Sequence, residues 1–177
     1  MSESPRPIYT IGHSNLSFET FLVALTAHGI TTLADVRTRP FSRFSRFNRA
    51  SLERSLGEAG ISYTYFGDSL GGRPSDPTCY RGGVLPERKE DVPRLIDYGE
   101  VASRPWFQDG LAELVELSRS GRVAVMCSEG DPDLCHRQHL IAQALLDRLP
   151  VLHILVDRSG ASTAVPAERR QVQEALL

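Results

Sequence analysis

The fourteen-residue segment CSEGDPDLCHRQHL, which begins at Cys127, holds an unusual concentration of side chains that can do chemistry. Its two thiols, Cys127 and Cys135, are candidate nucleophiles, and His136 directly follows the second one. Glu129 lies two residues after Cys127, on the same side of an extended segment, and is a candidate base. Arg137 adds a cation, which favours a thiolate and can hold an anionic substrate. The segment therefore predicts catalytic roles for the two cysteines, the glutamate and the histidine.

Other interpretations of the same segment remain open. Either cysteine can be a small buried hydrophobe, with capping as the role of the polar residues. A metal site would recruit Cys127, Cys135, His136 or His139, but the two cysteines lack the short paired spacing of structural zinc ligands. A reversible disulfide between the cysteines is also conceivable, although they do not form a C-x-x-C motif.

The segment also has the features of a helix start. Asp131 or Asp133 can cap the helix, and Pro132 suits its first turn. Cys135 and Arg137 then lie in or near that turn, where the helix dipole favours a thiolate and free backbone N–H groups can bind an anion.

A second concentration of functional side chains follows Asp35, in the stretch DVRTRPFSRFSRFNR. The stretch contains five arginines and no acidic residue after Asp35. The loop therefore has a local charge of about +5 in a chain with a net charge of -2. Three phenylalanines interleave with them, and such alternation suits stacking on unpaired bases and holding phosphates. The alternative is a loop anchored in the core by its aromatic rings. The residues concerned are Arg37, Phe41, Ser42, Arg43, Phe44, Arg46, Phe47 and Arg49, together with Arg39.

Two smaller motifs complete the candidate set. His13 ends the run PIYTIGH and is followed by Ser14, while LGGRPS offers backbone N–H groups at Gly71 and Gly72 beside Arg73. With Asp35 and a cysteine, His13 would supply the proton carrier of a nucleophile, base and orienting-group set. Ser14 and the LGGR loop would contact a phosphate group.

Alternating strand and helix patterns must position these groups. Apolar, β-rich runs predict strands at 7–13, 30–37, 61–67, 122–127 and 151–157. Helical spacing predicts helices at 18–28, 50–59, 92–103, 106–119 and 132–149, and residues 68–90 form a long Gly- and Pro-rich loop. The order predicts an α/β fold, with a mostly parallel five-stranded sheet covered by helices on both faces.

Residues 1–177 are expected to form one domain, with a core at 8–156 and a polar tail at 158–177 that holds one short helix. In parallel sheets, ligands bind outside the carboxyl ends of the strands. His13, Asp35, Arg37, the LGGR loop and Cys127 all fall at the carboxyl ends of predicted strands. We therefore expect His13, Arg37, Glu129 and Arg137 to surround one cleft.

The composition narrows the classes of protein. Hydrophobic residues at 41% and charged residues at 24% match a soluble globular protein. No apolar run approaches a membrane span and no secretion signal is evident, which predicts a cytoplasmic protein without a membrane partner. Three cysteines are too few for a disulfide framework, so reduced thiols are expected.

The motifs IYTIGHSN, HGITTLADVRTRPFSRF, LGGR and VAVMCSEGDPDLCHR together resemble the domain-of-unknown-function family 488, in order from about Ile8 to Val156. The resemblance implies a compact α/β domain and a shared set of polar residues, without a defined reaction. The matching positions are Gly12, His13, Ser14, Asp35, Arg37, Pro40, Ser42, Arg43, Gly71, Gly72, Cys127, Glu129, Cys135, His136 and Arg137.

The leading functional hypothesis is an enzyme that acts on a phosphate-bearing substrate, either a nucleotide or a nucleic acid. His13, Asp35 and the cysteine segment would do the chemistry, while the arginines hold the anion. The alternatives are a non-catalytic module that binds single-stranded nucleic acid through residues 37–49, and a thiol redox or metal-binding protein. No cofactor is expected, and the sequence does not define the oligomeric state.

Overall fold

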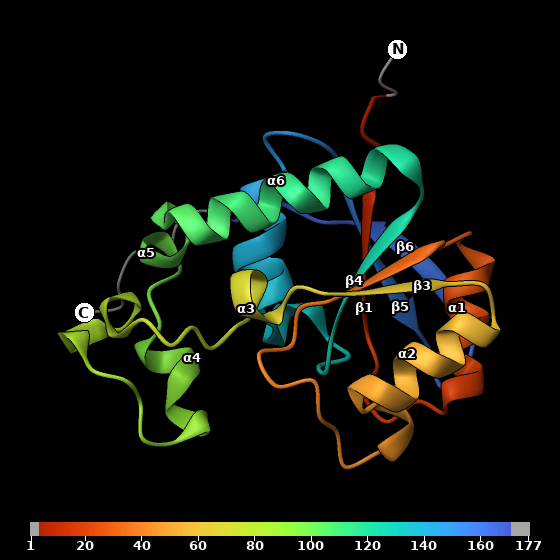
Figure 1. Cartoon of the computed structure of the whole chain (residues 1–177), viewed down its shortest axis with the longest axis horizontal. Coiled ribbons are helices and arrows are strands. Elements are labelled where there is room, and N and C mark those ends of the chain that lie inside the picture. The colour runs from red at the N-terminus through yellow and green to blue at the C-terminus, as the bar shows by residue number, and fades with distance from the viewer. Residues whose placement is uncertain (1–3, 171–177) are drawn as a thin grey trace.

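A computed structural model describes residues 4–170 and forms one mixed sheet with helices on both faces (Figure 1). The strand order is β3-β2-β4-β1-β5-β6. The first five strands pair in parallel, as predicted, and β6 pairs antiparallel to β5. The strands are β1 (Ile8–Gly12), β2 (Thr32–Asp35), β3 (Ser62–Tyr65), β4 (Val123–Cys127), β5 (Val151–Val156) and β6 (Ser162–Pro166).

Local signals set the first helix. The Ser17 side chain accepts a hydrogen bond from the Thr20 N–H at its start, and Gly29 follows its end with a φ of 67°.

The α-helices are α1 (Phe18–Ala27), α2 (Arg49–Glu58), α3 (Gly67–Leu70), α4 (Val92–Leu95), α5 (Tyr98–Ser103), α6 (Pro105–Ser120) and α7 (Gln143–Leu145). Short 3-10 turns occupy Ser45–Phe47, Pro77–Cys79, Arg81–Gly83, Lys89–Asp91 and Pro132–Leu134.

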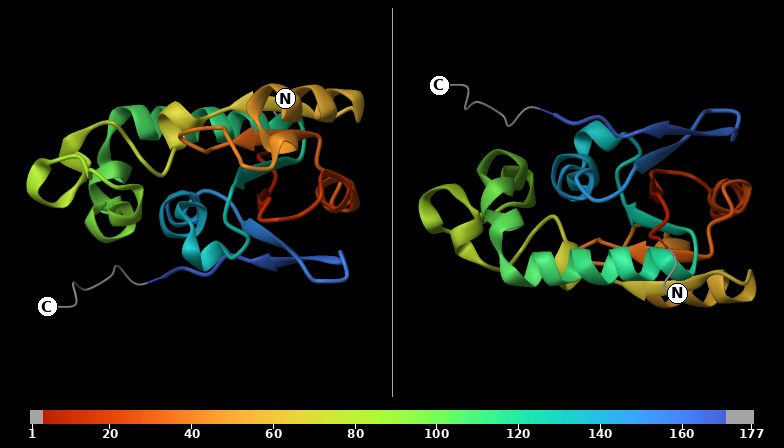
Figure 2. Two further views of the ribbon diagram at one scale, coloured as in Figure 1. Left: turned by 90° about the horizontal axis from the view of Figure 1, so that it is seen from below. Right: turned by 90° about the horizontal axis from the view of Figure 1, so that it is seen from above.

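The two faces of the sheet pack against different helices (Figure 2). Helices α1 and α2 cover one face through a cluster that includes Phe21, Leu52 and Phe47. Helix α6 and the chain that leads into α7 cover the other face through residues such as Leu111 and Ile141. We call these the α1/α2 face and the α6 face. Helices α4 and α5 form a lobe at one side of the molecule, away from the strands (Figures 1 and 2).

Three features differ from the pattern expected from the sequence. The continuous helix expected at 132–149 is a 3-10 turn, a π-helical segment at Arg137–Ala142 and the short α7. The helix expected at 92–103 is broken between α4 and α5, where the Ile96 backbone is extended. The tail contributes β6, and residues 158–170 contain no helix; the rest of the tail, where a short helix was also possible, lies outside the described residues.

The strand order brings three carboxyl ends together. Strand β4 lies between β2 and β1, so that Gly12 pairs with Cys127 and Asp35 pairs with Met126. Side chains alternate between faces along each strand, and this decides which neighbours can meet. No helix in the described part of the chain is both long and apolar enough to cross a membrane.

Candidate functional site

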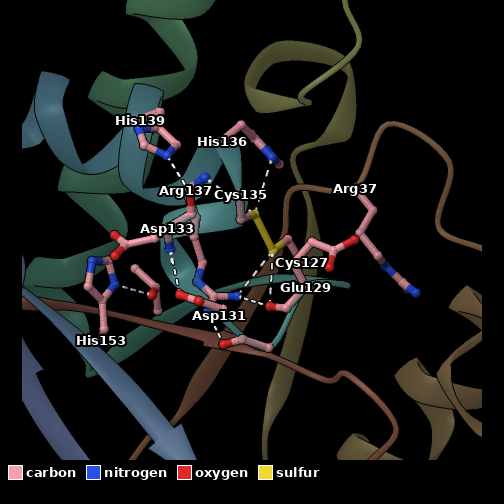
Figure 3. The surroundings of a disulfide bond; sticks show 12 residues. Arg37, Cys127, Glu129, Asp131, Asp133, Cys135, His136, Arg137, His139 and His153 are labelled. Carbon is pink, nitrogen blue, oxygen red and sulfur yellow. Dashed lines mark hydrogen bonds between the residues drawn. A yellow bond between two sulfur atoms is a disulfide. The ribbon is translucent and has the colours of Figure 1, made fainter. Parts of the chain in front are cut away.

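The two cysteines of the segment form a disulfide on the α6 face (Figure 3). Cys127 is the last residue of β4, and Cys135 follows the 3-10 turn that Asp131 caps through the Asp133 N–H. The expectation of reduced thiols therefore holds in the structure for the buried Cys79 and not for this pair. The two residues are 3% and 5% exposed, which restricts access to their sulfur atoms.

Arg137 anchors the disulfide from the first turn of the π-helical segment. Its side chain is fully buried, and Nη1 donates a hydrogen bond to the Cys127 Sγ at 3.2 Å. The same guanidinium donates to the carbonyl oxygens of Glu129 and Gly130, and its Nε has no hydrogen-bond partner within residues 4–170. Within residues 4–170 no carboxylate forms an ion pair with Arg137. Burial lowers the pKa of the guanidinium to about 10, so it stays charged at neutral pH.

His136 contacts the other sulfur. Its Nδ1 lies 3.6 Å from the Cys135 Sγ, and its Nε2 lies 3.1 Å from the Leu70 carbonyl oxygen. A carbonyl oxygen only accepts, so Nε2 carries the hydrogen and Nδ1 presents a lone pair to the sulfur. Burial lowers the pKa of His136 to about 4, which keeps the ring neutral at pH 7.

Two glycines, Gly12 and Gly72, provide the space that the Arg137 and His136 side chains occupy beside the disulfide. A Cβ on Gly12 would overlap the Glu129 carbonyl and the Arg137 guanidinium. A Cβ on Gly72 would lie 2.8 Å from Nδ1 of His136. The glycines of the GHS and LGGR motifs therefore allow close packing around the disulfide. For the LGGR motif, the sequence had instead predicted a contact with phosphate.

Three backbone N–H groups at the helix start are already engaged. Those of Gln138 and His139 bond to the Cys135 carbonyl, and that of Arg137 points to the Cys135 sulfur at 3.5 Å. The expected anion site at this helix start is therefore occupied by the protein itself. His139 is directed elsewhere, with its Nε2 at 2.6 Å from the Asp133 carbonyl. Among the described residues, no three His, Cys, Asp or Glu side chains cluster as potential metal ligands.

His13 and Asp35 lie on the opposite face of the sheet. The His13 ring stacks on Phe47 of the α1/α2 cluster at 4.4 Å between centroids. The Asp35 carboxylate accepts hydrogen bonds from Tyr63 and from Nε and Nη2 of Arg37. The single cleft expected for His13, Arg37, Glu129 and Arg137 is therefore divided: these residues share one edge of the sheet but not one face.

The arginine- and phenylalanine-rich loop divides in a similar way. Phe47 is 1% exposed and belongs to the core, whereas Phe41 is 74% exposed. Arg43 lies over the half-buried Phe44 and Arg46 over Phe18. A groove of about 410 Å³ runs between these side chains. The core-anchor interpretation is confirmed for Phe47, and ligand binding by the exposed part of the loop stays a prediction.

The remaining candidates have structural contacts. Ser42 shapes its loop, since its Oγ accepts from the Phe44 N–H. Ser14 has a φ of 47°, and its carbonyl contacts Nδ1 of His13. Arg73 is exposed, and its N–H donates to Thr38. The Glu129 side chain is also exposed, so only its carbonyl group enters the disulfide site.

Sequence reasoning missed a buried polar chain beside this site. His153 of β5 contacts the Thr10 hydroxyl through Nδ1 at 2.6 Å and the Gln138 amide oxygen through Nε2 at 2.7 Å. The amide oxygen accepts, so Nε2 carries the hydrogen. His153 and Gln138 border a cavity of about 510 Å³, which also touches the loop between the cysteines. The signal was available, since a histidine inside the apolar run VLHILV requires a buried partner.

The fold and site define a mostly parallel α/β domain with a cysteine pair at the carboxyl edge of its sheet. The family model described as Domain of unknown function DUF488 matches residues 17–145, and the chain belongs to this family. No curated protein matches the chain. No solved structure matches it either.

Proposed function

We propose that this protein is a thiol redox protein whose Cys127 and Cys135 alternate between disulfide and dithiol. One observation carries the proposal: the buried Arg137 donates to the Cys127 Sγ and has no carboxylate partner within the described residues. A buried cation requires a compensating charge or hydrogen bonds. In the reduced protein, the Cys127 thiolate supplies that charge.

The geometry assigns different roles to the two sulfurs. A small thiolate attacks the Cys135 Sγ, the S–S bond breaks, and Cys127 leaves as the thiolate that Arg137 stabilises. A second small thiolate attacks the resulting mixed disulfide. The external disulfide is then released, and the Cys135 thiolate takes a proton from solvent. Two electrons reach the protein, and His136 Nδ1 accepts the hydrogen bond of the new Cys135 thiol.

The proposed setting is the cytoplasm, where disulfides are mostly transient and redox-active. The small exposure of both cysteines favours a small thiol as the reaction partner. The couple needs no bound cofactor. Catalysis on a phosphate-bearing substrate stays a prediction, and the contact of Arg137 with Cys127 supports the redox proposal more directly.

The test equilibrates the protein with mixtures of reduced and oxidised dithiothreitol, then alkylates it under denaturing conditions and counts modified thiols by mass. We expect one modified thiol, that of Cys79, at the oxidising end and three at the reducing end. Cys79→Ser should lower both counts by one. Three modified wild-type thiols at every potential would show that the couple does not form and would refute the proposal.

The exposed part of the arginine- and phenylalanine-rich loop favours a second candidate function, the binding of single-stranded nucleic acid. Arg43 and Arg46 are exposed beside the groove, and Phe41 offers a free aromatic face. Binding of a short oligonucleotide should weaken steeply with salt, because neutralised phosphates release counterions. Replacing both arginines with alanine should flatten that dependence. Phe41→Ala should weaken binding by about 1 to 3 kcal/mol at every salt concentration if the ring stacks on a base.

An absence of oligonucleotide binding at low salt would exclude this second function. It would leave the redox proposal intact, because the loop and the disulfide lie on opposite faces of the sheet.

A further inference from the structure

Two buried polar atoms on the α1/α2 face have no hydrogen-bond partner within the described residues. They are Nε2 of His13 and Nη1 of Arg37, and these residues are 3% and 5% exposed. Leaving such groups unpaired destabilises the folded protein, and more so when the group is charged. Unpaired buried groups of this kind are expected at sites that receive a ligand or an ordered water.

The two atoms have opposite hydrogen-bonding characters. His13 Nδ1 lies 2.9 Å from the Ser14 carbonyl, so Nδ1 carries the hydrogen and Nε2 presents a lone pair. Burial lowers the pKa of His13 to about 4, so the ring stays neutral at pH 7. Arg37 Nη1 is a charged donor. A ligand that satisfies both atoms must therefore offer one hydrogen and one acceptor oxygen.

The surrounding side chains hold both groups in place. The Asp35 carboxylate accepts hydrogen bonds from Arg37 Nε at 2.9 Å and from Arg37 Nη2 at 2.7 Å. Nη1 is the guanidinium nitrogen that Asp35 does not contact. Phe47 stacks on the His13 ring with an interplanar angle of 11°. Arg37 follows β2, which Asp35 ends, and His13 follows β1, so His13 and Arg37 flank β4 at the carboxyl edge of the sheet.

The local charge favours an anion. Asp35 balances Arg37, His13 is neutral, and residues 38–49 carry four further arginines, Arg39, Arg43, Arg46 and Arg49, all exposed. Of these four, Arg46 forms an ion pair, at 3.5 Å to Glu19. The chain reaches the surface directly after Arg37, where Arg39 and Phe41 are exposed.

We propose that His13 and Arg37 form a second site, separate from the cysteines, for an oxyanion that carries its own hydroxyl hydrogen, with phosphate as the physiological example. Arg37 Nη1 donates to an ionised oxygen of the ligand, and the ligand hydroxyl donates to His13 Nε2. Inorganic phosphate has such a hydrogen at pH 7. Sulfate has the same shape but no hydrogen, so it would place an oxygen lone pair against that of His13.

Isothermal titration calorimetry of the full chain with inorganic phosphate and with sulfate, at pH 7 and equal ionic strength, tests the site. We expect saturable phosphate binding and at least tenfold weaker sulfate binding. His13→Phe keeps a ring on Phe47 but removes the lone pair, so its phosphate affinity should fall to that of sulfate. A circular dichroism melt checks that this variant folds.

Arg43→Ala/Arg46→Ala is the matched control for attraction to the exposed arginines, and it should retain the preference for phosphate. Wild-type protein that binds no phosphate would overturn the proposal. Equal affinities for phosphate and sulfate would overturn it as well, as would an unchanged preference in His13→Phe. None of these outcomes depends on the redox state of Cys127 and Cys135.

Discussion

Arg137 and Cys127 meet through a hydrogen bond of 3.2 Å, although one begins a π-helical segment and the other ends a strand. The guanidinium is held in place by the Glu129 and Gly130 carbonyls, so it does not need the disulfide for its orientation. A fixed cation against one sulfur of a disulfide favours the form in which that sulfur is negative. In the proposed redox couple, this contact makes the reduction of the pair depend on the charge of Arg137.

Removing this cation should make the couple harder to reduce. In Arg137→Met, the Cys127 thiolate loses its stabilising charge, and the midpoint potential should fall by about 30 mV for each tenfold loss in the reduction equilibrium. The dithiothreitol equilibration described above measures it. Arg54→Met, which changes an exposed arginine of α2, should leave the potential unchanged. An equal shift in both variants would show that Arg137 has no specific effect.

Gly72→Ala should destabilise the protein by about 1 to 3 kcal/mol, because its new Cβ would press on the His136 ring. Urea unfolding measures the change. Gly57→Ala is the matched control within a helix, since nothing lies within 4 Å of its added Cβ, and it should stabilise by about 0.5 to 1 kcal/mol. If Gly72→Ala proved neutral, His136 would have room to move away from Leu70.

Stability should fall in mild acid because of buried histidines such as His153. Burial lowers the pKa of His153 from 6.5 to about 4, so the unfolded chain binds its proton first. The stability that the neutral ring contributes is present above pH 6.5 and is lost as the pH falls toward 4, by up to about 1.4 kcal/mol per pH unit for each such histidine. His13 and His136 share this behaviour.

Urea unfolding at intervals between pH 4 and 7 measures this dependence. In His153→Gln, about a third of the slope should disappear, because one of three such histidines has been removed. A slope identical to that of the wild type would mean that His153 takes up its proton at the same pH in the folded and unfolded chains.

Two phenylalanines of one loop should respond in opposite ways to truncation. Phe47→Ala should cost about 3 to 5 kcal/mol, since this ring packs against His13 and Phe21 in the core. Phe41→Ala should change the unfolding free energy by less than about 0.5 kcal/mol, because that side chain is largely exposed. Thermal or urea unfolding of both variants distinguishes the anchor from the free ring. Similar losses in both would contradict this division.

Local patterns in the sequence were sufficient for most of the fold. Apolar runs predicted five of the six strands, and the Ser17 cap and Gly29 bounded α1 as expected, because propensity, capping and periodicity act within a few residues. The prediction of one continuous helix at 132–149 was wrong because the tertiary contacts of Cys135 and Arg137 impose an irregular backbone there. β6 was missed because its short run STAVP becomes a strand only by pairing with β5.

The sequence also predicted which strand ends carry polar side chains, but it did not assign them to faces. Strand order placed β4 between β1 and β2, and this order depends on packing of the whole sheet. Because side chains alternate between the two faces along a strand, His13 lies on the α1/α2 face and Cys127 on the α6 face. The position of the Arg137 guanidinium beside Cys127 requires clearance at Gly12, which is remote in sequence. Residue types along a chain determine the available chemistry, whereas the contacts between distant segments decide which groups can act together.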